Sequence, residues 1–237
     1  MKRVVTVVLG AGLVLVLGCG TQNYEYRLEH TIEKMKYQKR LDDNLTGAAT
    51  KGTLERFQIF VRPPKDMAPT KAFQLAVIEP GRFDVEQSFM EPEKQSLHIL
   101  ARVKQPKTPG KKGAPKAEQT PRGDFTTDIV DLLRTVYAVE INTGDFKEEK
   151  RADNSFKYKM LDLNAKNVQI YLYGSKSSPY EVALIFEYPK TEHNSVNPKI
   201  GLCLEAFATG QKAKLAFAGG DVEEEAAPEE TAQPVAF

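Results

Sequence analysis

The sequence predicts an α+β fold in which a single, mainly antiparallel sheet of about seven strands is flanked by helices and preceded by an N-terminal helix. Two blocks, 54–103 and 156–188, alternate apolar and polar residues, and prolines or glycines separate the alternating runs. Two stretches, 125–140 and 197–210, instead carry apolar residues at spacings of three and four. Strands that come in runs, with helices between the runs, favour an antiparallel α+β arrangement.

The first nineteen residues have the features of an export signal. Lys2 and Arg3 precede the apolar run Val4–Leu17, and Gly18 and Cys19 follow it. Fourteen residues are too few to cross a hydrocarbon core about 30 Å thick as a helix, which takes about twenty. The length is typical of the hydrophobic region of a signal peptide. We therefore expect residues 1–18 to be removed.

Residues Leu15–Cys19 resemble the lipobox of bacterial lipoproteins, in which Gly or Ala precedes an obligatory cysteine. The resemblance implies diacylglycerol on the Cys19 thiol and cleavage after Gly18. Two or three acyl chains hold a protein on a bilayer, where one chain would be marginal. Gly20 replaces the Asp that retains lipoproteins in the inner membrane of the best-known Gram-negative system, which favours the outer membrane. An uncleaved anchor is the alternative.

Residues 19–52 are predicted to tether the lipid anchor to the domain. Tyr24, Leu28, Ile32 and Met35 lie on one face of a helix predicted over 22–45. The small residues that follow indicate a hinge. The helix is either a flap that docks on the domain or a spacer that holds the domain away from the membrane.

The first alternating block predicts four strands with one buried face. Their inward residues are Phe57, Ile59 and Val61, then Phe73, Leu75 and Val77, then Phe83, Val85 and Phe89, and finally Leu97, Ile99 and Val103.

Residues 104–123 interrupt this pattern with a net charge of +5, four prolines and three glycines. So few apolar residues cannot offset the entropy of ordering, so we predict a disordered basic loop. It is either a solvated insertion or a segment that docks on an anionic surface, such as lipid head groups or cell-wall polymer.

The helix predicted over 125–140 begins after Asp124, a suitable N-cap. Asp124, Asp128 and Asp131 lie near its N-terminus, where acids complement the helix dipole. We expect a solvated acidic face there, with a paired-carboxylate site as the alternative.

Three more strands are predicted over 156–163, 167–173 and 180–188. A final helix is predicted to start with Asn197 as cap and Pro198 as first residue and to end at Gly210. The globular domain therefore covers 53–217. The tail 218–237 carries a net charge of −6 and is predicted to be disordered.

No motif in the sequence predicts catalysis or a cofactor. His30, His98 and His193 are far apart and lack metal-ligand spacing, so we expect surface or packing roles and no metal or other cofactor. Cys203 lies on the apolar stripe of the last helix, which indicates a buried, inert thiol. After cleavage the chain has 31 basic and 32 acidic side chains, and this balance argues against nucleic-acid binding.

The element order over Leu54–Gly210 resembles the Mog1/PsbP-type α/β/α sandwich, with strand 180–188 leading through a loop into helix 197–210. The resemblance carries no motif residues, so it transfers no functional residue. Members of that group are mostly non-enzymatic accessory or binding proteins, which implies a similar role here.

We therefore expect a membrane-anchored envelope lipoprotein that acts as a binding or assembly module. Its expected partners are the membrane, through the lipid on Cys19, and an envelope protein or an anionic surface. The alternatives are an envelope enzyme that acts on cell-wall or peptide substrates and a structural lipoprotein.

Overall fold

The computed structural model describes residues 24–48, 52–70, 81–103, 123–174, 179–211 and 213–214. The chain divides into two compact units, one up to Asn44 and one from Leu45 onward. The described part of the first unit is the helix α1, residues 24–44, which confirms the predicted N-terminal helix. The predicted signal peptide 1–18, Cys19, the basic loop up to residue 122 and the acidic tail 218–237 lie outside the described residues.

The second unit is built on a seven-stranded sheet in which every neighbouring pair is antiparallel. The order across the sheet is β2-β3-β4-β8-β7-β6-β5. The strands are β2 (Ala68–Thr70), β3 (Val85–Glu91), β4 (Gln95–Val103), β5 (Lys147–Arg151), β6 (Asn154–Asp162), β7 (Lys166–Tyr173) and β8 (Tyr180–Pro189). The α+β fold class predicted from the sequence is confirmed.

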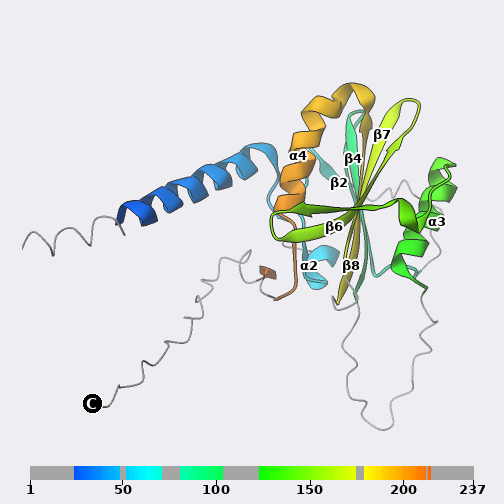
Figure 1. Cartoon of the computed structure of the whole chain (residues 1–237), viewed down its shortest axis with the longest axis horizontal. Coiled ribbons are helices and arrows are strands. Elements are labelled where there is room, and N and C mark those ends of the chain that lie inside the picture. Colours follow the sequence, from blue (N-terminus) through cyan, green and yellow to red (C-terminus); the bar gives the residue numbers. More distant parts are fainter. Residues whose placement is uncertain are drawn as a thin grey trace, which may run out of the picture. The chain divides into compact units, whose positions relative to one another are not determined.

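The helices α3 (Phe125–Tyr137) and α4 (His193–Glu205) lie on opposite sides of this sheet (Figure 1). Successive side chains of a strand point to opposite faces, so each central strand contributes to two cores. On the α3 side, Ile129 and Leu133 pack in a cluster with Leu100, Ile170 and Ile185. The intervening positions face α4. These two layers enclose the strands β4, β8 and β7, which are buried along most of their length.

The first predicted strand lies outside the large sheet. Thr53–Arg56 forms a short helix, α2, and Gln58 has a left-handed φ of 55° that interrupts the extended chain. Only Ile59–Phe60, β1, is extended, and it pairs with β9 (Ala208–Thr209) in a separate two-stranded sheet. The strand predicted around 73–77 lies outside the described residues.

Two strands of the large sheet, β2 and β5, were not predicted, and both lie at its ends. An edge strand needs no second apolar face, and charges or prolines on it discourage pairing with another chain. β5 is Lys-Glu-Glu-Lys-Arg and carries no apolar residue, while β2 is three residues long and contains Pro69. Neither strand therefore has the alternating pattern from which strands are predicted.

The predicted helix boundaries need three corrections, one of which is that the last helix, α4, ends at Glu205 instead of Gly210, since Ala208–Thr209 is strand β9. α3 ends at Tyr137 instead of 140, because Ala138 adopts a left-handed conformation with φ of 51°. α4 begins at His193 instead of Asn197, since a 3-10 turn, Lys190–Glu192, follows β8 directly and leads into the helix. Pro198 therefore lies inside α4, and His193 lies in a helix. Among the described residues, no helix is long and apolar enough to cross a membrane.

Candidate functional site

A cavity of about 800 Å³ opens at one end of the large sheet. Its walls come from the turn between β3 and β4, from residues 137–139 at the end of α3, from the β6–β7 turn at 162–166, and from 187–189 at the end of β8. Small-molecule sites in proteins commonly have volumes of about 300–1,000 Å³. The cavity is therefore large enough for a ligand, and its walls combine charged, aromatic and aliphatic side chains.

Glu187 is the buried acid of this cavity, with a side chain only 10% exposed. The Tyr137 hydroxyl donates a hydrogen bond to Glu187 Oε1 over 2.5 Å, and the Lys166 ammonium forms an ion pair with Oε2. His98 Nε2 lies 3.3 Å from Oε1. Glu187 thus joins the last turn of α3 and the start of β7 to the middle of β4.

These contacts keep Glu187 ionised. Burial alone would raise the pKa of the carboxyl group, but the donors of His98, Lys166 and Tyr137 outweigh burial and hold the pKa at about 2, below its ordinary 4.5. The same burial, together with the Glu187 charge, raises the pKa of Tyr137, so the phenol stays protonated. Glu187 therefore carries its negative charge at neutral pH and is paired with the Lys166 ammonium.

Behind Glu187, His98 connects the carboxylate to Ser88. Ser88 Oγ lies 2.8 Å from His98 Nδ1, so one imidazole nitrogen faces a hydroxyl and the other a carboxylate. The order serine, histidine, acid is that of a nucleophilic triad. However, Ser88 is 1% exposed and His98 is fully buried, and neither residue lines the cavity. In this arrangement the Ser88 hydroxyl cannot reach a substrate, and the chain of contacts links two strands inside the core.

Further ion pairs surround the opening. Lys94 Nζ lies 2.6 Å from Glu91 Oε1, and Gln95 Nε2 donates to Glu91 Oε2 over 2.8 Å. Lys190 pairs with Asp162 on the opposite side. The Lys166 ammonium, besides its contact with Glu187, lies 5.1 Å from the centre of the Tyr137 ring, a cation–π distance.

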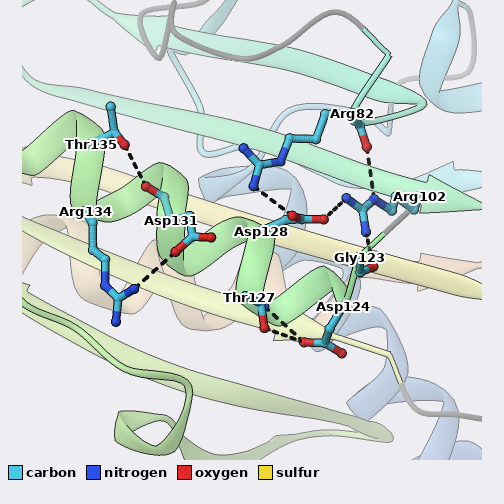
Figure 2. A network of polar contacts seen from close by, with 9 residues as sticks. All are labelled: Arg82, Arg102, Gly123, Asp124, Thr127, Asp128, Asp131, Arg134 and Thr135. Atoms are coloured by element: carbon cyan, nitrogen blue, oxygen red, sulfur yellow. Dashed lines mark hydrogen bonds and ion pairs between the residues drawn. The ribbon is translucent and has the colours of Figure 1, made fainter. Parts of the chain in front are cut away.

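A second polar network lies around Arg102 and Gly123, the described residues close to the two ends of segment 104–122 (Figure 2). Arg102 donates to the carbonyl oxygens of Arg82 and Gly123, each over 3.0 Å, and forms an ion pair with Asp128. Arg82 binds the other Asp128 oxygen over 2.7 Å. The Arg102 side chain is 5% exposed, so a buried guanidinium fixes the residues next to both ends of segment 104–122.

The three aspartates of α3 have separate partners, which corrects the expectation of a solvated face. Asp124 caps the helix by accepting a hydrogen bond from the Thr127 N–H over 3.0 Å, as predicted. Asp128 is bound by Arg82 and Arg102 and is 16% exposed, because Arg82, in the turn before β3, and Arg102, on β4, reach over the first turn of α3. Asp131 pairs with Arg134 over 3.1 Å (Figure 2).

The three histidines are not brought together. His30 lies in α1 and is exposed, His98 is buried in β4, and His193 begins α4 with its ring stacked on Tyr188. Within the part of the chain that the structure describes, no three His, Cys, Asp or Glu side chains are grouped so that they could hold a metal ion.

Cys203 is fully buried in α4, and burial raises the pKa of its thiol to about 12. Because the thiolate is the reactive form, we expect iodoacetamide at pH 8 to leave Cys203 unmodified in the native protein and to alkylate it in urea. Peptide mass spectrometry of both samples measures this. Alkylation at equal rates in the two samples would contradict the burial.

Sequence reasoning did not identify the residues of this cavity. Glu187 stands in an otherwise apolar strand segment, Val182–Tyr188, and a lone acid inside such a strand was the available signal. Its partners Tyr137 and Lys166 are 29 residues apart, and only the packing of α3 on the sheet brings them together.

No protein family model matches the chain, and no curated protein is found as a relative. Similar solved structures include a protein from Bacteroides thetaiotaomicron, with a TM-score of 0.40 and 9% identity over 70% of this chain and 49% of that one. Cyanobacterial PsbP from Synechocystis has a TM-score of 0.42 and 8% identity over 70% of this chain and 93% of that one. The Ran-binding protein Mog1p from Saccharomyces cerevisiae has a TM-score of 0.33 and 10% identity over 73% and 91%.

The chain spans about half the length of the Bacteroides protein. PsbP and Mog1p are the two proteins after which the fold type suggested by the element order is named. At these identities the likeness concerns the fold alone, and no ligand, partner or residue role is transferred from these structures to this chain.

Proposed function

We propose that this chain is a lipid-anchored binding module of a bacterial envelope, and that its binding site is the cavity next to Glu187. The cavity carries the proposal, because it combines about 800 Å³ of space with a buried, fixed charge and apolar walls. The anchor is inferred from the lipobox resemblance at Leu15–Cys19 and from the apolar run before it.

The ion pairs around the cavity support a role in binding. Lys166, Tyr137 and His98 hold Glu187 in place, so its position changes little when a ligand enters. A preorganised site of this kind gives specificity at low entropic cost. The walls come from four separate chain segments, so the ligand would contact both the end of α3 and the ends of several strands of the sheet.

An enzyme that acts on cell-wall or peptide substrates is the second candidate, because Ser88, His98 and Glu187 lie in the order of a triad. The enclosed position of Ser88 speaks against this function. A structural lipoprotein, which would only space the envelope, would have no use for the cavity.

One native mass-spectrometry experiment tests both parts of the proposal. We expect the protein extracted from membranes to begin at Cys19, to carry diacylglycerol, and to retain a bound molecule. Ala165→Trp should lose that molecule, because the exposed Ala165 lines the cavity and a large ring there fills it. Ser155→Trp, at the other end of β6, should keep it.

Three results would contradict the proposal. An unmodified Cys19, or a chain that begins at Met1, would rule out the lipid anchor. Equal ligand content in the wild type and in Ala165→Trp would rule out the cavity as the binding site and would favour the structural role.

A further inference from the structure

The large apolar side chains that remain exposed are gathered on α1. Within the described residues, every largely exposed hydrophobic side chain of this size belongs to this helix, namely Tyr24, Tyr26, Leu28, Ile32, Met35 and Tyr37. Their exposed fractions run from 37% for Tyr37 to 73% for Tyr26. Exposed apolar side chains that lie together commonly mark a surface that contacts a protein or a membrane.

Four of these side chains form one stripe along α1. They are Tyr24, Leu28, Ile32 and Met35, which follow one another at spacings of four, four and three residues. Residues at these spacings lie on the same face of a helix. At 1.5 Å per residue the stripe is about 17 Å long. The next two positions of this face are Lys39 and Asp42, so the apolar stripe ends at Met35.

The last turns of α1 are polar and exposed. Gln38 Nε2 donates to Asp42 Oδ1 over 3.0 Å, and Lys39 pairs with Asp43 over 3.1 Å. The Lys39 and Asp43 side chains are 76% and 59% exposed. A coiled coil needs an apolar seam of about three to four heptads, which is longer than residues 24–35. A second copy of the helix therefore does not fit the stripe well.

The chain just before α1 places the stripe next to a membrane. Cys19 precedes Tyr24 by five residues, and five extended residues span at most about 18 Å. The lipid on Cys19 proposed above would hold this point at the bilayer, and so would the alternative, an uncleaved anchor over Val4–Leu17. A contact that is too weak to bind by itself is favoured when a nearby anchor holds its two sides together.

We propose that residues 24–35 of α1 lie in the interface of the lipid bilayer, with the stripe turned toward the acyl chains and the polar last turns in water. Amphipathic helices bind bilayers in this way, and tyrosine is enriched at the interface. The helix carries five bases and five acids, so the contact does not depend on anionic lipid. This inference rests on the membrane attachment in the proposed function.

The fluorescence of single tryptophans tests the inference, because the chain itself has no tryptophan. The full chain is purified from membranes and reconstituted in phosphatidylcholine vesicles whose acyl chains carry bromine, which quenches indole fluorescence by contact. Met35→Trp places the indole on the stripe, at its end far from the anchor. We expect brominated vesicles to lower its fluorescence about twofold or more, relative to unbrominated vesicles.

Tyr37→Trp is the matched control. Residue 37 is two positions further along α1 and points to the opposite side of the helix, so its fluorescence should change little. Adding Ile32→Asp to Met35→Trp puts a charge into the stripe and should reduce the quenching to the level of this control. Adding Lys34→Asp instead, at an exposed position outside the stripe, should leave the quenching unchanged.

The outcomes separate this inference from the proposed function. Quenching in neither single variant, with diacylglycerol found on Cys19 of the same sample by mass spectrometry, would overturn the inference and leave the lipid anchor. Equal quenching in Met35→Trp and Tyr37→Trp, or quenching unaffected by Ile32→Asp, would overturn the stripe as the contact.

Two further results identify other occupants or another anchor. If the indole of Met35→Trp were unquenched by bromine but shielded from aqueous iodide, the stripe would be covered by the domain or by a second copy, and the inference would be wrong. A chain that begins at Met1, with Met35→Trp quenched as expected, would overturn the lipid on Cys19 and support the contact of α1 with the bilayer.

Discussion

Replacing Arg102 by methionine is expected to lower the free energy of unfolding by about 3 kcal/mol, because it removes a buried, fully paired charge. The guanidinium donates to the Arg82 and Gly123 carbonyl oxygens and to Asp128, and it lies over the rings of Phe83 and Phe125 at 5.4 and 5.6 Å. Methionine retains the apolar stem of the side chain but leaves two carbonyl oxygens without a donor. Urea unfolding of the full chain at pH 7 measures the change.

Arg151→Met is the matched control for this prediction. Arg151 pairs with Glu149 over 2.6 Å, but its side chain is 40% exposed. Exposed ion pairs contribute about 0–1 kcal/mol, so this variant should be nearly as stable as the wild type. If both variants lost the same unfolding free energy, the burial of Arg102 would not explain its contribution to stability.

Glu187→Gln is expected to destabilise the protein by about 3 kcal/mol at pH 7 and to remove the part of its acid sensitivity between pH 4.5 and 2 that comes from this carboxyl group. The folded-state pKa of about 2 lies below the ordinary 4.5. In this interval the unfolded chain therefore binds more protons. The stabilisation is complete above pH 4.5 and is lost as the pH falls to 2.

The measurement is the difference in unfolding free energy between the wild type and the variant at several pH values from 7 to 2. We expect the difference to shrink as the pH falls. Glu140→Gln, at an exposed acid outside the cavity, should show little difference at any pH. If the difference in unfolding free energy between the wild type and Glu187→Gln stayed constant with pH, the ionised Glu187 carboxylate would not be what stabilises the wild type.

The parts of the fold that the sequence predicted are those in which at least one face is buried, and the central strands β4, β7 and β8 bury both faces instead of the one face expected. β3, β4, β6, β7 and β8 alternate or are uniformly apolar, and α3 has both an apolar stripe and the Asp124 cap. The elements that were missed or misplaced lack that local signal. β5 is an edge strand that pairs with β6, and the start of α4 depends on the turn after Pro189.

The candidate site could not be predicted in the same way, because its residues share no local pattern. Glu187, Tyr137 and Lys166 come from three elements, and Gln95 is notable only because its Oε1 has no donor among the described residues of the folded chain. Long-range packing determines both facts. The charged residues can be read from the sequence, but which of them become buried depends on how the helices and turns pack on the sheet.

The ends of the large sheet constrain how any protein partner can bind. Many binding domains accept a partner as an additional strand on an open sheet edge. In the described part of this sheet, one outermost strand is the uniformly charged β5 and the other is the short β2 with Pro69, which lacks a backbone donor. Recognition by strand addition is therefore disfavoured on both sides, and a protein partner would have to engage loops and side chains at the ends of the strands.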